Sequence, residues 1–286
     1  MAVDRPVIVE IENKIYQINE FGLDCMYVIC GESRALVVDT GMGYCDFRAI
    51  IGELTKLPYD VVITHGHVDH AGGADQFREV WIHPNDVGRA KSIYYERRIE
   101  DGDRFRLKNG IWDYGHENVR YWDEFPGIRE LYDGQTFDLG GRLITVVYTP
   151  GHTYGSCCFL DSKSRIAFVG DALGNVPKSY VSKRLIGLRN LKKHEEEFDR
   201  MYGGHAGRML NSSSKPKRLL DDCIKATEMV LEGKLPLIRK SSHFEHTDSR
   251  ASAVYGQDMF TFDTDRLRET GRWEPDYQNY CKTELK

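Results

Sequence analysis

The chain has 286 residues, of which 41% are hydrophobic, and its formal net charge is −5. This composition provides for a sizeable core and excludes a general nucleic-acid binder, which would carry an excess of basic residues. No apolar run approaches the roughly 18 residues that a membrane span needs, so we expect neither a membrane nor a nucleic-acid partner. The first residues contain no apolar segment typical of a secretory signal, and we therefore expect a cytoplasmic protein.

The seven cysteines are scattered along the chain and include no Cys-x-x-Cys pair. An odd number at irregular spacing favours reduced core thiols over a disulfide framework. Cys157 and Cys158 are adjacent within a predicted strand, so their side chains should point to opposite faces of a sheet.

Short apolar runs in the first third of the chain predict strands over 7–18 and 25–40, in hairpins. Asp46 is placed to cap a helix over about 47–56, which Pro58 terminates. Further strands are predicted over 59–63 and 80–82, and a second helix should begin at Pro84. His83, beside that proline, is interpreted as a structural residue.

Residues 91–130 are rich in aromatic side chains interleaved with charges and show no clear period. A stretch of this length is rarely an idle loop. It could be a cap over a substrate pocket, in which case Trp112 and Trp122 would contact substrate, or an irregular subdomain with its own small core. His116 fits either interpretation.

The second half of the chain repeats the layout of the first. Hairpins are predicted over 136–147 and 156–169, and a helix over about 191–201. Ser214 should cap an amphipathic helix that has Pro216 in its first turn and ends at Gly233, with a late strand at 259–262. Two such halves predict two sheets packed together and covered by helices.

The most informative stretch is Thr64-His65-Gly66-His67-Val68-Asp69-His70, which directly follows a predicted buried strand. Neutral imidazole and carboxylate groups are the ligands that zinc takes in water-activating sites. Four such groups within six residues predict a metal site at the end of that strand.

Three later residues share a setting with this stretch. His152, Asp171 and His205 each follow a glycine, which lets the chain turn sharply towards a common cavity. Asp39, at the end of an earlier strand, could either anchor a turn or support the metal ligands, and both interpretations are kept.

These motifs, in this order, resemble the metallo-β-lactamase fold superfamily, which includes glyoxalase II and acyl-homoserine-lactone lactonases. The resemblance covers about residues 10–210. It implies an α/β (α+β) fold, a four-layer αβ/βα sandwich. We expect a single domain over 1–286, with an aromatic-rich insertion or cap at about 91–130 and a C-terminal helix plus strand at about 214–265.

The resemblance also implies a metal centre with two divalent ions, most often Zn²⁺, with iron or manganese as alternatives. Asp171 would bridge the two ions, and Asp69 and Asp171 would be the catalytic carboxylates. The implied ligands are His65, His67 and His152 for the first ion, and Asp69, His70 and His205 for the second.

The implied reaction is attack by a metal-bridging hydroxide on a small ester, thioester or lactone. His70 and Asp171 differ from the residues typical of antibiotic-hydrolysing members. Gly174 stands where lactonases often have a tyrosine, and Tyr154 and Tyr180 are candidate substitutes as hydroxyl donors to substrate.

Other functions share this ligand motif. The alternatives are a mononuclear iron persulfide dioxygenase, a phosphodiesterase, or a metal-binding member of the fold without catalytic activity. In each case the expected partner is a small-molecule substrate or ligand, and a homo-oligomer is possible.

Overall fold

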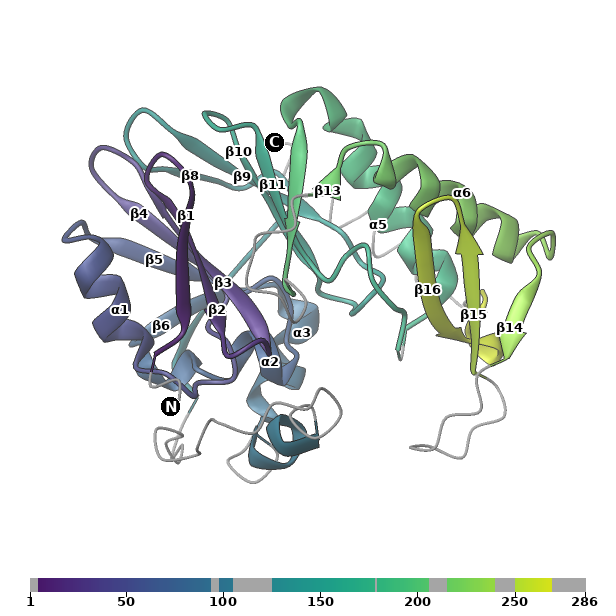
Figure 1. The fold of residues 1–286 in the computed structure, drawn as a ribbon, viewed down its shortest axis with the longest axis horizontal. Helices are drawn as coiled ribbons and strands as arrows, with labels where there is room; N and C mark the ends of the chain where they lie inside the picture. The colour runs from purple at the N-terminus through teal and green to yellow at the C-terminus, as the bar shows by residue number, and fades with distance from the viewer. Residues whose placement is uncertain are drawn as a thin grey trace.

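The computed structural model describes residues 5–93, 98–104, 125–177, 179–205, 215–239 and 250–268. These ranges form three β-sheets of seven, six and three strands (Figure 1). The two larger sheets pack face to face with helices on their outer sides, so the predicted four-layer αβ/βα fold is confirmed. No helix in the described ranges is long and apolar enough to cross a membrane.

The seven-stranded sheet follows chain order and begins as an antiparallel meander. From the fourth strand onwards the strands are parallel, because helical segments form the crossovers between them. Its strands are β1 (Val7–Glu12), β2 (Ile15–Glu20), β3 (Asp24–Cys30), β4 (Ala35–Val38), β5 (Tyr59–Val62), β6 (Glu79–Ile82) and β7 (Gly127–Glu130).

The helices of this half are α1 (Phe47–Leu54), α2 (Val68–Ala71) and α3 (Pro84–Lys91), and residues 98–104 are also helical. Asp46 caps α1 as predicted, since its side chain accepts a hydrogen bond from the Ala49 amide. The insertion predicted over about 91–130 is too long at its C-terminal end. Its last four residues form β7, which pairs with β6.

The six-stranded sheet contains β8 (Thr136–Asp138), β9 (Leu143–Tyr148), β10 (Cys157–Asp161), β11 (Ile166–Gly170), β12 (Arg200–Gly203) and β13 (Lys215–Pro216). The helix predicted over 191–201 is wrong: α5 covers Val181–Lys193, and β12 begins at Arg200. Polar residues buried in α5, including Lys183, Arg184 and Asn190, obscure its apolar period.

The helix predicted from Ser214 exists but begins later. It is α6 (Leu219–Leu231), while Lys215 and Pro216 form β13 at the sheet edge, where a proline costs no ladder bond. Ser214 lies outside the described residues. Gly233 follows the helix with φ +67°, as expected of a C-terminal stop.

Neighbouring residues in the strands face different cores. Val28 packs towards the first set of helices, whereas Ile29 packs between the two sheets. Cys157 lies between the sheets and Cys158 packs towards α5 and α6, as the strand geometry predicts. The six cysteines in the described ranges are all free and buried.

The third sheet contains β14 (Leu237–Arg239), β15 (Arg250–Tyr255) and β16 (Asp258–Asp263), and only its last strand is predicted from the sequence. Figure 1 shows it beyond α6, at the opposite end of the molecule from the seven-stranded sheet. Phe260 and Phe262 pack with Ala226 and Val230 of α6 in a separate small core.

Candidate metal centre

The chain segment from Thr64 to His70 turns immediately after β5 and enters the short helix α2 at Val68. Three further predicted ligands follow strands of the second sheet: His152 comes after β9, Asp171 after β11 and His205 after β12. Because β9, β11 and β12 run in the same direction, their carboxyl ends share one sheet edge.

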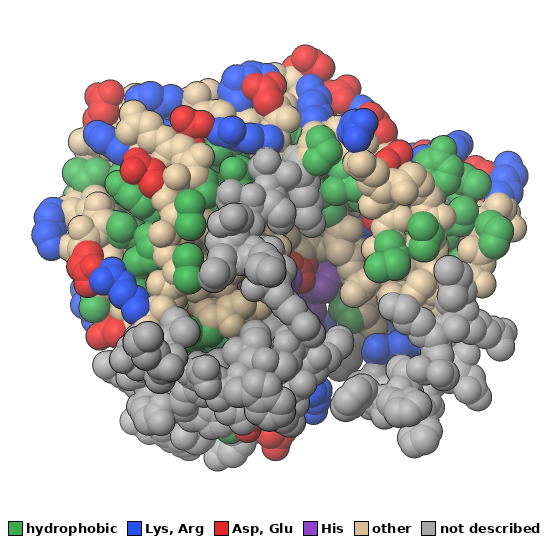
Figure 2. All heavy atoms as spheres, viewed as in Figure 1, with side chains coloured by type: hydrophobic (Ala, Val, Ile, Leu, Met, Phe, Trp, Pro, Cys, Tyr) green, Lys and Arg blue, Asp and Glu red, His purple; other side chains and the backbone are tan. Residues whose placement is uncertain are grey.

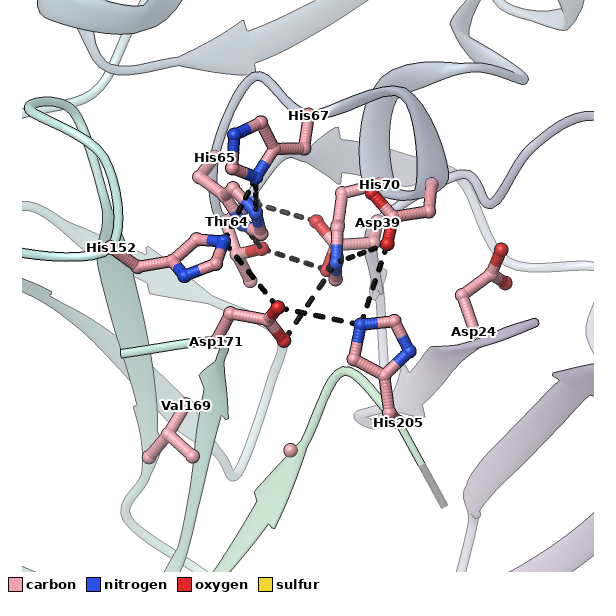
Figure 3. Close-up of polar contacts among 12 residues, drawn as sticks. Asp24, Asp39, Thr64, His65, His67, His70, His152, Val169, Asp171 and His205 are labelled. Carbon is pink, nitrogen blue, oxygen red and sulfur yellow. Dashed lines mark hydrogen bonds and ion pairs between the residues drawn. The ribbon is translucent and has the colours of Figure 1, made fainter. Parts of the chain in front are cut away.

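The structure brings all seven predicted ligands together at this edge, where the two large sheets meet. Figure 3 labels Asp171 and the histidines of this set. The space-filling view shows histidine and acidic side chains at the base of a hollow between two lobes (Figure 2). The cluster therefore combines one continuous motif with three residues that are distant in sequence.

One side of the cluster is made of imidazole nitrogens alone. Nδ1 of His67 lies 3.0 Å from Nε2 of His65 and 2.8 Å from Nε2 of His152. These three residues can serve as ligands of a single ion.

The other side is richer in carboxylate. Oδ2 of Asp69 lies 3.7 Å from Nε2 of His70 and 3.4 Å from Nε2 of His205. Asp171 stands between the two sides, with its oxygens 3.8 Å from Nε2 of His70, 3.3 Å from Nε2 of His205 and 3.5 Å from Nε2 of His152. This position suits a carboxylate shared by two ions.

Hydrogen bonds on the outer side of the cluster fix the orientation of four imidazoles. The Nδ1–H of His152 donates to the Asn175 carbonyl at 2.8 Å, and that of His205 donates to the Leu23 carbonyl at 2.7 Å. Since a carbonyl only accepts, Nδ1 is the donor in each ring, and Nε2 is the nitrogen that faces the cluster. Asn175 and Leu23 act through backbone atoms and leave no signal in the sequence.

Asp39 makes contacts that fit both interpretations considered for it. It ends β4 in the left-handed region, at φ +63°, and accepts hydrogen bonds from the Thr64 amide and hydroxyl. The same carboxylate accepts the Nδ1–H of His70 at 2.8 Å. Because the Thr64 hydroxyl already donates to Asp39, its oxygen accepts from Nδ1 of His65.

Gly204 shows why glycine precedes a candidate ligand. A Cβ at this position would lie 2.4 Å from Cε1 of His70 and 2.9 Å from Oδ1 of Asp171. Any side chain here would displace the centre of the cluster.

The pKa values of the histidines are shifted in opposite directions on the two sides of the cluster. Burial, reinforced by neighbouring imidazoles, lowers the pKa of His65 and of His67 well below the usual value, and burial also lowers that of His152. Burial opposes a charge on His205 too, but Asp171 and Asp69 outweigh it and raise its pKa to about 10. The carboxylate side of the cluster therefore attracts positive charge.

The residues present fit divalent metal ions. Nε2 of His70 is buried and has no hydrogen-bond partner in the described part of the chain, although it points into the cluster. A buried ring nitrogen without a partner is costly, and a metal ion at the position that it faces would supply that partner. The donor set of imidazoles and carboxylates suits zinc, iron and manganese alike.

The remaining predicted residues have different outcomes. His83 is structural, as expected: its ring stacks on Tyr148 at 4.3 Å, and Nδ1 accepts from the Asn85 amide at the start of α3. Tyr154 lies two residues beyond His152, and Tyr180 directly precedes α5, so their contact with substrate stays a prediction. Trp112, Trp122 and His116 lie outside the described residues.

Comparison with known families now identifies the class of protein. Residues 25–222 match the family model described as "Metallo-beta-lactamase superfamily". The chain belongs to this superfamily.

Two groups of curated relatives carry the names of thioesterases. The chain is 29% identical over 187 residues to "Acyl-coenzyme A thioesterase MBLAC2" of Gallus gallus, covering 58% of this chain and 65% of the relative. It is 25% identical over 244 residues to "Atrochrysone carboxyl ACP thioesterase" of Passalora fulva, covering 82% and 63%. The chain thus spans less than two thirds of the length of these relatives.

Solved structures confirm the fold. A metallo-β-lactamase family protein of Thermus thermophilus has a TM-score of 0.52 at 21% identity, covering 78% of this chain and 82% of that one. An inverting sec-alkylsulfatase of Pseudomonas sp. has a TM-score of 0.58 at 13% identity, covering 80% and 42%.

Proposed function

We propose that this protein is a dinuclear metal-dependent hydrolase that acts on a thioester. The single observation that carries this proposal is the convergence of seven buried or half-buried ligand groups into two sets around Asp171. Both named relatives described above are thioesterases, which favours a thioester among the ester, thioester and lactone substrates considered.

In this proposal the first ion is held by His65, His67 and His152. The second ion is held by the remaining predicted ligands of the cluster, which are Asp69, His70 and His205, with Asp171 shared. Zinc is the expected metal, with iron or manganese as alternatives. A bound pair of divalent ions would lower the pKa of a bound water to near neutrality. The ions would also act as a Lewis acid on the substrate carbonyl oxygen.

The chain's own groups complete this chemistry. Asp69 is about one-third exposed at its side chain, so its carboxylate contacts the cluster and is also accessible from outside it. This position allows its carboxylate to hold a proton and pass it to the leaving group. The thiol released from a thioester has a pKa near that of cysteine, about 8.5. Its thiolate therefore leaves with less acid assistance than the alkoxide of an alkyl ester.

The test measures metal content by elemental analysis and thiol release from acyl-coenzyme A substrates by the purified protein. An ester and a lactone of the same acyl length provide the comparison. We expect two ions per chain, preferential thioester cleavage, and loss of at least one ion and of turnover in Asp171→Ala. His83→Asn is the matched control, because this buried histidine lies outside the cluster.

Two results would replace the proposal. One iron per chain with oxygen uptake on a glutathione persulfide would identify a persulfide dioxygenase. Full metal occupancy without turnover of any ester, thioester, lactone or phosphodiester would identify a metal-binding protein without hydrolase activity.

A further inference from the structure

The loop after β11 has two connections to the candidate metal centre. It begins with Asp171, and four residues later the Asn175 carbonyl accepts the Nδ1–H of His152 at 2.8 Å. A displacement of this loop would therefore move one candidate ligand and release the orientation of another.

The same loop is held by a strand of the C-terminal sheet. The Thr261 amide donates to Oδ1 of Asn175 at 2.8 Å, and the Val176 amide donates to the Thr261 carbonyl at 2.8 Å. Val176 pairs with Phe262 as a parallel bridge, and both side chains are buried. Strand β16 thus binds the loop at Asn175 and Val176 through hydrogen bonds.

A buried arginine adds a second attachment. Arg184 of α5 donates from Nη2 to the Leu173 carbonyl at 2.9 Å, and the same nitrogen lies 3.1 Å from Oδ1 of Asp258 at the start of β16. Its guanidinium carbon lies 4.0 Å from the ring centroid of Phe260. The loop is consequently tied to β16 on both sides of Gly174.

The other oriented imidazoles depend on a different part of the fold. His65, His70 and His205 bond to Thr64, Asp39 and Leu23, which all belong to the first half of the chain. Among the described contacts, His152 alone has its outer partner in a loop bound by the C-terminal sheet.

We infer that the C-terminal sheet is a positioning element of the metal centre, and that it sets the orientation of His152 through Asn175. The inference rests on the proposed function only in taking His152 as a metal ligand. Asn175 is a positioning residue, since its side chain binds β16 and its carbonyl binds the imidazole. Outer partners of metal-binding histidines commonly contribute about 10- to 100-fold to metal affinity.

The experiment compares Asn175→Ala with the full-length wild-type protein. Because Asn175 is exposed, alanine should leave the protein folded while freeing the loop from the Thr261 amide. We expect about tenfold weaker binding of one of two Zn²⁺ ions, measured by competition with a chromophoric chelator. The NMR signal of the His152 Nδ1–H in the metal-free protein should broaden or disappear.

Two further variants separate positioning from a general loss of sheet stability. Asn175→Asp keeps a side-chain acceptor for the Thr261 amide and should restore the imidazole signal and the affinity. Ser252→Ala removes the 2.9 Å hydroxyl contact with Thr261 inside the same sheet and should change neither.

The outcomes distinguish this inference from the proposed function. Wild-type affinity and an intact imidazole signal in Asn175→Ala would overturn the inference while leaving the hydrolase proposal in place. An equal loss in Ser252→Ala would also overturn it, because general weakening of the sheet would then suffice. A wild-type protein that binds no Zn²⁺ would instead refute the metal centre itself.

Discussion

Oδ2 of Asp39 lies 2.8 Å from Nδ1 of His70, and both side chains are buried where the first sheet ends. The same aspartate accepts two hydrogen bonds from Thr64 while its backbone is held at φ +63°. One carboxylate therefore sets both the turn after β4 and the direction in which His70 presents Nε2.

We expect Asp39→Asn to lower Zn²⁺ affinity at one of the two positions by about 10- to 100-fold. Asparagine tolerates the left-handed backbone, but its single carbonyl oxygen cannot replace two carboxylate oxygens for the donors of Thr64 and His70. Competitive metal titration measures the effect. Asp60→Asn, at a half-exposed ion pair with Arg34, is the control and should keep wild-type affinity.

Gly204→Ala should disrupt the centre without breaking the backbone. The added Cβ would approach Cε1 of His70 to 2.4 Å, so the imidazole must move. Metal content should fall by at least one ion, and thioester hydrolysis by more than about 100-fold, an order of magnitude consistent with misplaced catalytic groups. Gly52→Ala in α1 meets no atom within 4 Å and should leave both properties unchanged.

The pH dependence of stability has an identifiable contribution from His83. Burial lowers its pKa to about 4, from an unfolded value of 6.5. The unfolded chain therefore binds a proton between pH 6.5 and 4 that the folded protein does not, so stability falls as pH falls through this window.

His83 is expected to lower the free energy of unfolding by about 2 kcal/mol as the pH falls from about 7 to about 5. His83→Asn preserves a side-chain acceptor for the Asn85 amide at the start of α3. Its free energy of unfolding in urea should therefore decline less over this range than that of the wild type. Parallel declines in the two proteins would refute the assignment.

Arg184→Met should destabilise the protein by about 3–5 kcal/mol, because it leaves the buried Asp258 carboxylate without its counter-charge. Urea unfolding of the metal-free protein measures this loss. Arg189→Met breaks an exposed ion pair with Glu228 and should change stability by less than about 1 kcal/mol. Similar losses in both variants would contradict the special role of the buried pair.

Much of the site can be predicted from sequence because its ligands are adjacent to recognisable strands and glycines. The motif from His65 to His70 follows an apolar strand, and His152 and Asp171 follow two more. Strand alternation also places Cys157 and Cys158 on opposite faces, as observed. In these segments local pattern and tertiary burial agree.

Prediction fails where polar residues are buried. Lys183, Arg184 and Asn190 are buried in α5, so its apolar period is obscured and the predicted helix lies too late in the chain. The C-terminal sheet is only partly predicted because β14 has three residues, and because the sequence of β15, Arg-Ala-Ser-Ala-Val-Tyr, begins with small and polar residues rather than an apolar β-branched run. The carbonyls of Leu23 and Asn175 escape prediction because any residue type can supply a backbone acceptor.

The division of the ligands between the two large sheets has a consequence for folding. His67 comes from a loop of the first sheet and His152 from a strand end of the second, so neither sheet alone can form the proposed centre. Metal capture must then follow the docking of the two sheets. An ion held by both residues would act as a cross-link across the seam between the sheets, and its removal should increase amide hydrogen exchange there first.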